Sequence, residues 1–167
     1  MNKETKDSLI KELQNFLGDD LQEIHEEYHY PLFLIKSSRL HDTCRYLKEK
    51  LHFTYLNELI GTDRFTSDER FEVIYHLLSL RHRQRFFIKV RIDEQNPVLP
   101  TVTDIWKGAN WNEREVYDMF GIRFEGHPDL RRIYLPEDFK YFPLRKEFPL
   151  LGIPGSLEMP NTIPDHD

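Results

Sequence analysis

The sequence predicts an α+β fold: helices packed on one face of a largely antiparallel sheet, with an extended Pro-rich C-terminal arm. Apolar residues recur at helical spacing in two early segments, strand-like runs follow in the middle, and five prolines fall within the last 28 residues. A chain of 167 residues is long enough for one domain with a hydrophobic core. We therefore expect an α+β domain (1–100), a signature region with a short helix and charged turns (101–139), and the C-terminal arm (140–167).

Two amphipathic helices are expected in the first third of the chain. Over residues 5–17 the apolar side chains fall on one helical face, and Gly18 follows as a stop signal. A second helix is expected over residues 37–51, with Ser37 or Ser38 as its cap. The residues between the two helices read as two short extended pieces that meet near Tyr30.

Three strand-like runs occupy residues 53–63, 70–80 and 85–92. In the last run, apolar residues at every second position alternate with mostly charged ones, which is typical of a strand with one buried face. The short stretch RHRQ between the second and third runs predicts a β-hairpin. Its basic residues could touch phosphate or lipid head groups, although a solvated turn is the simpler account.

Composition excludes several classes of function. The formal charge of −6 argues against a dedicated nucleic-acid binder, which needs a clustered excess of Lys and Arg. Cys44 is the only cysteine, so this chain alone can build neither a disulfide framework nor a cysteine-ligated iron–sulfur or zinc site. The position of Cys44 on an apolar helical stripe favours a core residue over a nucleophile. A cytoplasmic compartment is the natural expectation.

The stretch NWNEREVYDMFGIRFEGHPDLRRI, residues 110–133, has the charge density of an active site. Local structure offers another explanation, because Asn112 can cap a helix from Glu113 to Phe120 with Glu115 as its capping-box partner, and Gly121 can end it. Within that helix, Arg114 and Asp118 are spaced for an i,i+4 ion pair. A metal or acid–base site built from Glu113, Glu115 and His127 is the less favoured alternative, since no paired-histidine motif occurs.

The arm keeps many apolar residues although its prolines prevent regular structure. A disordered linker would be polar, so this segment has surface to bury. Two possibilities stay open at this point: the arm lies on another protein, or it folds back over its own domain.

Residues 102–150 closely resemble the signature region of the C subunit of NADH-quinone oxidoreductase, a family that includes the J subunit of chloroplast NDH. The runs EREVYDMFGI, GHPDLRRI and PLRKEFP carry the resemblance, in the family's order and spacing. The resemblance over residues 1–101 is weaker and rests on the order of elements and on the GTD that ends the first long strand.

The resemblance implies a non-catalytic structural subunit in the peripheral arm of proton-translocating complex I, which holds the quinone-reducing module together by docking on the neighbouring D subunit. It implies further contacts with the B and I subunits, no nucleic acid, and indirect membrane association on the cytoplasmic side of the bacterial inner membrane. NADH, FMN, iron–sulfur clusters and quinone would be used by other subunits, with no cofactor, metal or catalytic residue in this chain. The signature residues would then be structural or interface groups: Trp111, Glu113, Arg114, Glu115, Asp118, Phe120, Gly121, His127, Pro128, Asp129, Arg131, Arg132, Arg145 and Phe148.

Two rival functions remain. The chain could be the equivalent subunit of a related membrane-bound hydrogenase or ferredoxin-dependent complex, because such machines contain similar subunits. Less favoured is a free-standing metal-dependent hydrolase that uses Glu113, Glu115 and His127.

Overall fold

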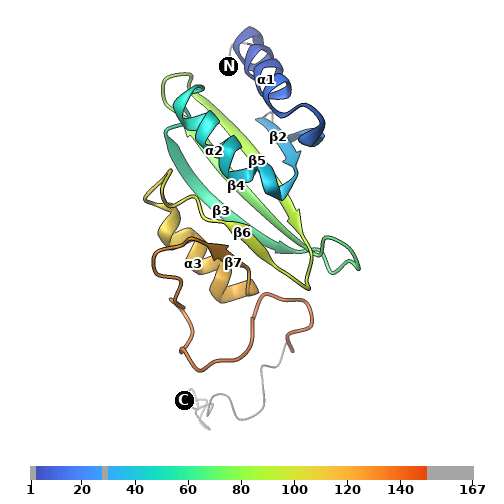
Figure 1. Ribbon diagram of the computed structural model, residues 1–167, viewed down its shortest axis with the longest axis vertical. Coiled ribbons are helices and arrows are strands. Elements are labelled where there is room, and N and C mark those ends of the chain that lie inside the picture. The colour runs from blue at the N-terminus through green and yellow to red at the C-terminus, as the bar shows by residue number, and fades with distance from the viewer. Residues whose placement is uncertain (1–2, 28–29, 150–167) are drawn as a thin grey trace, which may run out of the picture.

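A five-stranded sheet forms the centre of the computed structural model, which describes residues 3–27 and 30–149 (Figure 1). The strand order is β1-β2-β5-β4-β3, and every neighbouring pair is antiparallel except β2 and β5, which are parallel. The predicted fold class is confirmed, although the parallel pair was not foreseen. The strands are β1 (Leu21–Glu27), β2 (Tyr30–Ile35), β3 (Tyr55–Asp63), β4 (Phe71–Ser79) and β5 (Gln84–Ile92).

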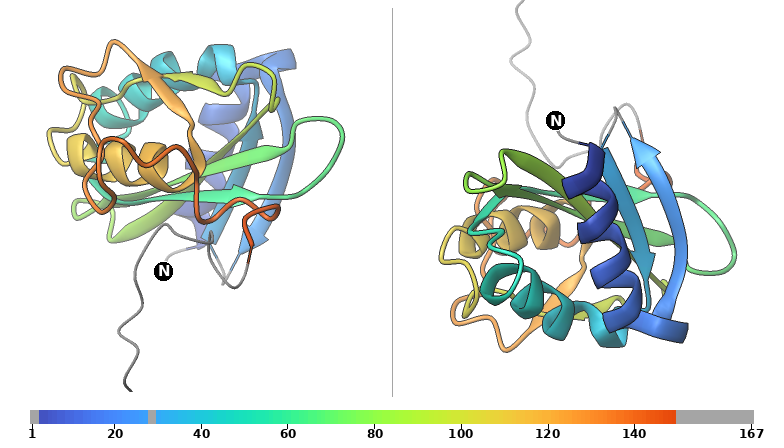
Figure 2. Two further views of the ribbon diagram at one scale, coloured as in Figure 1. Left: turned by 90° about the horizontal axis from the view of Figure 1, so that it is seen from below. Right: turned by 90° about the horizontal axis from the view of Figure 1, so that it is seen from above.

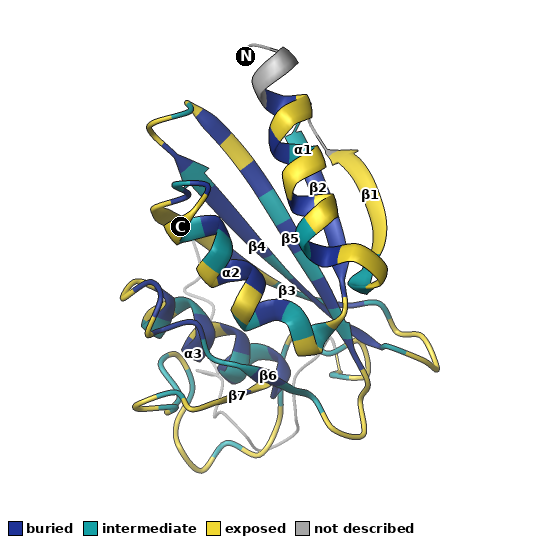
Figure 3. Ribbon diagram, turned by 45° about the horizontal axis from the view of Figure 1, so that its top comes forward, coloured by how far each residue is buried: buried dark blue, intermediate teal, exposed yellow. Residues whose placement is uncertain are grey.

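Three α-helices supply apolar side chains to one core against this sheet. They are α1 (Lys3–Leu17), α2 (Leu40–Glu49) and α3 (Ala109–Phe120), and the helical faces turned toward the strands are buried (Figure 3). Every second residue along β4 and β5 joins the same core, including Val73, Tyr75 and Ile88. Because successive strand residues point to opposite faces, the three helices cover a single face of the sheet. Figure 2 shows this grouping from two further sides.

The predicted second helix begins differently from the sequence expectation. Residues Ser37–Arg39 form a short 3₁₀ turn, and α2 follows directly from it without a side-chain cap. The expectation that a serine caps the helix is therefore wrong, since the 3₁₀ turn leads the backbone straight into the helix. Cys44 lies in the core with no exposed surface, as its place on the apolar stripe predicted.

A second, two-stranded parallel sheet brings the signature region onto the domain. Strand β6 (Val98–Pro100) pairs with β7 (Arg123–Glu125), which directly follows α3. Leu99 and Phe124 from these strands, together with Trp106, belong to the same hydrophobic core as the large sheet. The signature region is therefore anchored in the domain at both ends of α3.

Gly61 sets how closely α3 approaches the sheet. A Cβ atom at this position would lie 2.7 Å from a ring carbon of Phe120 and 3.2 Å from a methyl group of Val116. The glycine of the GTD stretch thus allows α3 to lie directly against β3. Within the described part of the chain, no helix is long and apolar enough to cross a bilayer.

Candidate functional site

Helix α3 begins at Ala109, four residues before the predicted start at Glu113. Hydrogen-bonded turns lead into the helix, with the amide of Trp106 bonded to Val102 and that of Ala109 bonded to Trp106. Gly108 occupies the capping position and makes no side-chain cap. The predicted capping box of Asn112 and Glu115 is therefore wrong, because both residues lie inside the helix.

Asp118 is the centre of the largest polar cluster on α3. Its carboxylate has no exposed surface and accepts a hydrogen bond of 2.7 Å from the guanidinium of Arg132. It also accepts three backbone N–H groups, from Ile133 at 2.9 Å, Tyr134 at 2.7 Å and Leu135 at 3.2 Å. Burial opposes the charge, but these bonds outweigh burial and hold the pKa of Asp118 below its usual value. A single buried carboxylate therefore fixes the backbone of a turn 14 to 17 residues further along the chain.

Arg114 holds the same turn from a neighbouring position on α3. Its guanidinium donates to the carbonyl oxygens of Arg131 at 2.9 Å and Arg132 at 3.2 Å, and it lies over the Trp111 ring at 5.0 Å. The predicted ion pair between Arg114 and Asp118 is wrong, because each of the two residues finds its partners on the turn. Helical spacing alone did not reveal a competing partner so far away in sequence.

Glu113 lies on the buried side of α3 and is fully enclosed. It accepts a hydrogen bond of 2.6 Å from the Thr101 hydroxyl and one of 2.7 Å from the Val102 amide. His127 Nε2 lies 4.0 Å from Glu113 Oε2, and both side chains are fully buried. Burial raises the pKa of Glu113 to about 7 and lowers the pKa of His127. Glu113 therefore tethers the loop before α3, while His127 lies within hydrogen-bond distance of the carbonyl of Asn110 at 3.2 Å.

The first ten residues of the predicted arm pack on their own domain. The amide of Leu144 bonds to the carbonyl of Met119 at 3.2 Å, and the Arg145 guanidinium donates to the carbonyl of Phe120 at 2.7 Å. Gly121 takes the predicted left-handed conformation, with φ of 76°, and a Cβ there would meet the Phe142 ring at 2.6 Å. For residues 140–149 the folded-back alternative is therefore correct. The expectation for residues 150–167 lies outside the described residues.

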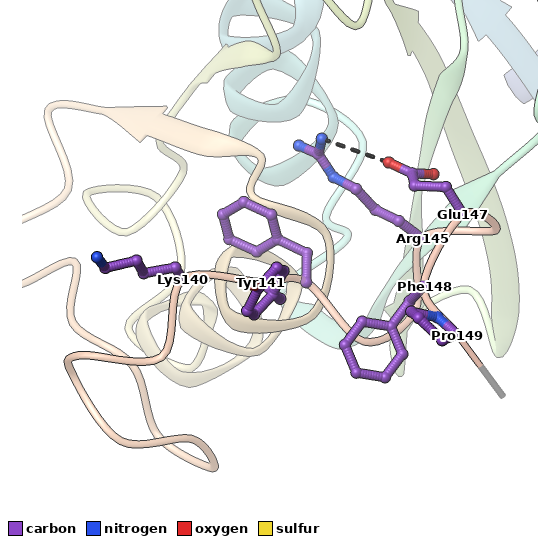
Figure 4. Close-up of a pocket in the computed structure, with 7 residues that line it drawn as sticks. Lys140, Tyr141, Arg145, Glu147, Phe148 and Pro149 are labelled. Atoms are coloured by element: carbon purple, nitrogen blue, oxygen red, sulfur yellow. Dashed lines mark ion pairs between the residues drawn. The ribbon is translucent and has the colours of Figure 1, made fainter. Parts of the chain in front are cut away.

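A second ion cluster, of which the sequence indicated only Asp63, holds the end of this segment. Asp63 and Arg70 form a two-pronged buried pair, with N–O distances of 2.7 and 2.9 Å. Asp63 also accepts the backbone amide of Lys146 at 2.8 Å, and Arg70 pairs with Glu147. The carboxylate of Glu147 also faces Arg145, as the dashed line in Figure 4 marks. The GTD stretch drew attention to Asp63, but partners up to 83 residues away leave no local pattern.

Some of the remaining signature residues contact other side chains, and others are exposed to solvent. Asp129 and Arg131 form an exposed pair at 2.6 Å, and Phe148 lies beside the ring of Phe139 at 6.5 Å. Three more signature residues are exposed as well: Trp111, Glu115 and Pro128. The structure thus brings Arg114, Asp118 and Arg132 together at one turn, divides most of the other signature residues among separate contacts, and leaves a few facing outward.

The alternative metal cluster does not assemble among the described residues. Glu113 is buried and Glu115 is exposed, so the two carboxylates point to different sides of α3, as their spacing predicted. Within residues 3–27 and 30–149 no group of three His, Cys, Asp or Glu side chains is placed to hold a metal ion. Burial raises the pKa of the Cys44 thiol far above its usual range, which favours the unreactive protonated form.

The elevated pKa of Glu113 gives a testable dependence of stability on pH. The folded pKa of about 7 exceeds the ordinary value of 4.5, so this group's contribution is full below pH 4.5 and is lost as the pH rises through 7. The loss is on the order of 3 kcal/mol. Glutamine does not titrate, so the free energy of unfolding of Glu113→Gln should depend less on pH. Between pH 5 and pH 8, urea unfolding should show a smaller decrease in that free energy for the variant than for the unchanged chain. The exposed Glu115→Gln is the matched control, and equal decreases in all three proteins would refute the assignment.

Comparison with known proteins places this arrangement in a family. Residues 33–153 match the family model described as "Respiratory-chain NADH dehydrogenase, 30 Kd subunit". The chain belongs to this family. The resemblance noted in the sequence is thereby confirmed, and the family is that of the complex I protein also called the C subunit of NADH-quinone oxidoreductase.

Curated relatives of the 30 kDa subunit family align over most of the chain. The second C subunit of NADH-quinone oxidoreductase from Rhizobium etli is 44% identical over 142 residues, which are 84% of this chain and 75% of that protein. The C subunit from Moorella thermoacetica is 41% identical over 144 residues, 86% of this chain and 95% of that protein.

Two solved structures share the fold. The trypsin-resistant fragment of Nqo5 superposes with a TM-score of 0.66 at 35% identity, covering 75% of this chain and 99% of the fragment. A chain of the membrane-bound sulfane sulfur reductase, described as an archaeal respiratory membrane complex, superposes with a TM-score of 0.74 at 25% identity, covering 87% of this chain and 86% of that one.

Proposed function

We propose that this member of the 30 kDa subunit family is a non-catalytic structural subunit in the peripheral arm of a proton-translocating NADH:quinone oxidoreductase. Its role is to hold the quinone-reducing module together by docking on the D subunit, with further contacts to the B and I subunits. Flavin, iron–sulfur clusters, NADH and quinone belong to other subunits in this proposal. The chain would be attached to the cytoplasmic side of the bacterial cell membrane through the complex.

One observation supports the proposal: the buried charged side chains of the signature region bind backbone groups and hold the backbone in place. Asp118 and Arg114 fix the turn at residues 131–135, and Arg145 and Asp63 fix the segment that follows. These charged side chains have their partners inside the domain, so their role is to fix the conformation of the backbone. The backbone is therefore held on the domain up to Lys146, close to the last residue that the structure describes.

The sequence after that point suits a contact with another protein. Residues 150–167 contain six large apolar residues, which are Leu150, Leu151, Ile153, Leu157, Met159 and Ile163. They contain three prolines and two glycines as well, so they are poorly suited to a helix or a central strand. Such a segment can stabilise a complex by burying apolar surface at about 25 cal/mol per Å².

Deleting residues 150–167 tests the proposal. The truncated subunit should still fold, because the clusters around Asp118 and Asp63 are retained, but the D subunit should be lost when the complex is purified through a tag on this chain. A full-length control replaces Asp165 and Asp167 with asparagine and should retain the D subunit. Undiminished recovery of the D subunit and quinone reductase activity in the truncated complex would refute the docking role.

A related complex is the second candidate, favoured by one specific likeness. The superposition with a chain of an archaeal membrane-bound sulfane sulfur reductase covers most of both chains. The same docking role could therefore serve a machine that takes electrons from another donor. Membranes that lack this subunit should lose NADH oxidation under the first proposal, and should keep it under the second.

A further inference from the structure

We propose that a groove between β3 and α3 receives an extended, basic segment of a partner subunit, which adds to the sheet as a strand beside β3. The inference rests on the proposed function, because it requires that this chain docks on other subunits. It assigns a second docking site within the folded domain, separate from the segment after residue 149.

The groove exposes the edge of the sheet. Strand β3 is the last strand of the sheet, paired with β4 on one side only. The groove has a volume of about 260 Å³, and four consecutive β3 residues, Glu58 to Gly61, line it. Consecutive residues of a strand point to opposite faces of the sheet. A groove that is lined by four consecutive residues therefore does not lie on one face but runs along the backbone at the edge of the sheet.

The outer backbone groups of this edge are available for pairing. Among the residues that the structure describes, no backbone hydrogen bond joins residues 56–62 to a segment other than β4. A row of unpaired N–H and C=O groups is a template for another strand. The opposite edge of the sheet, β1, is less suited to pairing with another strand. It carries the exposed carboxylates of Glu23 and Glu26, and charged side chains on an edge strand discourage pairing.

Helix α3 forms the second wall of the groove. Met119 provides partly exposed apolar surface, the nearly buried Val116 and Phe120 lie behind it, and Leu144 adds a side chain that is 53% exposed. Ile60 on β3 is 38% exposed beside them. An edge strand facing a helix is the arrangement in which peptide-binding domains take up an extended peptide, with backbone bonds giving affinity and side-chain pockets giving specificity.

The charges around the groove indicate the chemistry of the occupant. Two carboxylates, those of Glu58 and Glu115, are among the lining residues, no Lys or Arg is among them, and both glutamates are exposed. An incoming strand with Lys or Arg at its outer positions and apolar residues toward α3 would match both features. About five residues are enough to span such a site.

The chain's own C-terminal residues are a poor match for this groove. Residues 150–167 contain no Lys or Arg, carry Glu158, Asp165 and Asp167, and include prolines at 154, 160 and 164 that cannot donate to a ladder. Like charges would repel at the groove's rim. The expected occupant is therefore a segment of another protein.

Peptide binding to the full chain tests the site directly. The probe is a labelled peptide with alternating lysine and valine, measured by fluorescence anisotropy and by hydrogen exchange of the amides in residues 56–62. The peptide should bind and slow that exchange. Glu58→Lys combined with Glu115→Lys should weaken binding at least tenfold. Asp19→Lys combined with Glu49→Lys changes the net charge equally at exposed positions elsewhere, and should leave binding within twofold.

Three results would overturn the site. They are the absence of binding, equal weakening by both double variants, and equal binding of a second peptide in which every valine is replaced by proline. In the purified complex, Glu58→Lys with Glu115→Lys should also reduce co-purification of a partner subunit, while the control pair should not. Loss of the D subunit on truncation at residue 149 with no peptide binding would refute the groove alone, which separates its failure from that of the proposed function.

Discussion

Replacing Asp118 with alanine is expected to lower the free energy of unfolding by about 3–5 kcal/mol, the usual cost of removing one partner from a buried ion pair. The substitution leaves the Arg132 guanidinium without its carboxylate and three backbone amides without an acceptor. Orphaned buried donors each add to the cost. Urea unfolding of the full chain at pH 7 measures the change.

Two further substitutions make the Asp118 result specific. Asp118→Asn keeps an acceptor oxygen for the amides but loses the charge, so it should destabilise the protein less than alanine does. Asp129→Ala removes a carboxylate from a solvent-exposed pair with Arg131, so it should leave the urea midpoint almost unchanged. If the alanine variants at positions 118 and 129 unfold at the same urea concentration, Asp118 does not hold the turn.

Short-range patterns in the sequence predicted the elements of the fold well. The alternation along residues 85–92 identified β5 and its buried face, and the apolar stripe placed Cys44 in the core. Gly121 took the left-handed helix end that its position suggested. Each of these features is decided by neighbours within a few residues, so periodicity and turn chemistry are sufficient to find it.

Long-range pairing was beyond the same reasoning. The parallel pairing of β2 with β5 and the small β6–β7 sheet depend on which distant segments meet, and no local pattern encodes that. The predicted ion pair between Arg114 and Asp118 was wrong for the same reason, because helical spacing considers only neighbours on the helix. The turn at residues 131–135 offers both side chains better partners, and a fully buried carboxylate needs several donors.

The high density of charged residues in 110–133 therefore has a structural explanation. Neither the active-site interpretation nor the predicted helix cap accounted for it fully. Arg114, Asp118 and Arg132 make the contacts between α3 and a later turn, and Glu113 binds the loop before α3. Buried charges of this kind are costly unless each is satisfied, which explains why so many donors converge on one carboxylate. The same clusters hold the turn at residues 131–135 and the segment around Lys146 on the domain.

Asp63→Ala is expected to destabilise the protein by about 3 kcal/mol at pH 7 and to loosen the segment around residue 146. The carboxylate accepts both prongs of Arg70 and the amide of Lys146, so alanine removes the anchor between β3 and that segment. Burial opposes the charge of Asp63. Hydrogen bonds from Arg70 and from two backbone amides outweigh it and lower the pKa to about 2.

The low pKa of Asp63 determines how this effect depends on pH. Its contribution to stability is complete above the ordinary value of 3.8 and is lost as the pH falls through 2, so the difference between the unchanged chain and Asp63→Ala should shrink in acid. Unfolding measured at pH 7 and pH 2.5 gives both differences. Trypsin should also cleave after Lys140 and Lys146 faster in the variant. Asp68→Ala, in the exposed loop after β3, should change neither quantity. A difference that is the same at both pH values, with unchanged cleavage, would show that Asp63 does not anchor the segment as a carboxylate.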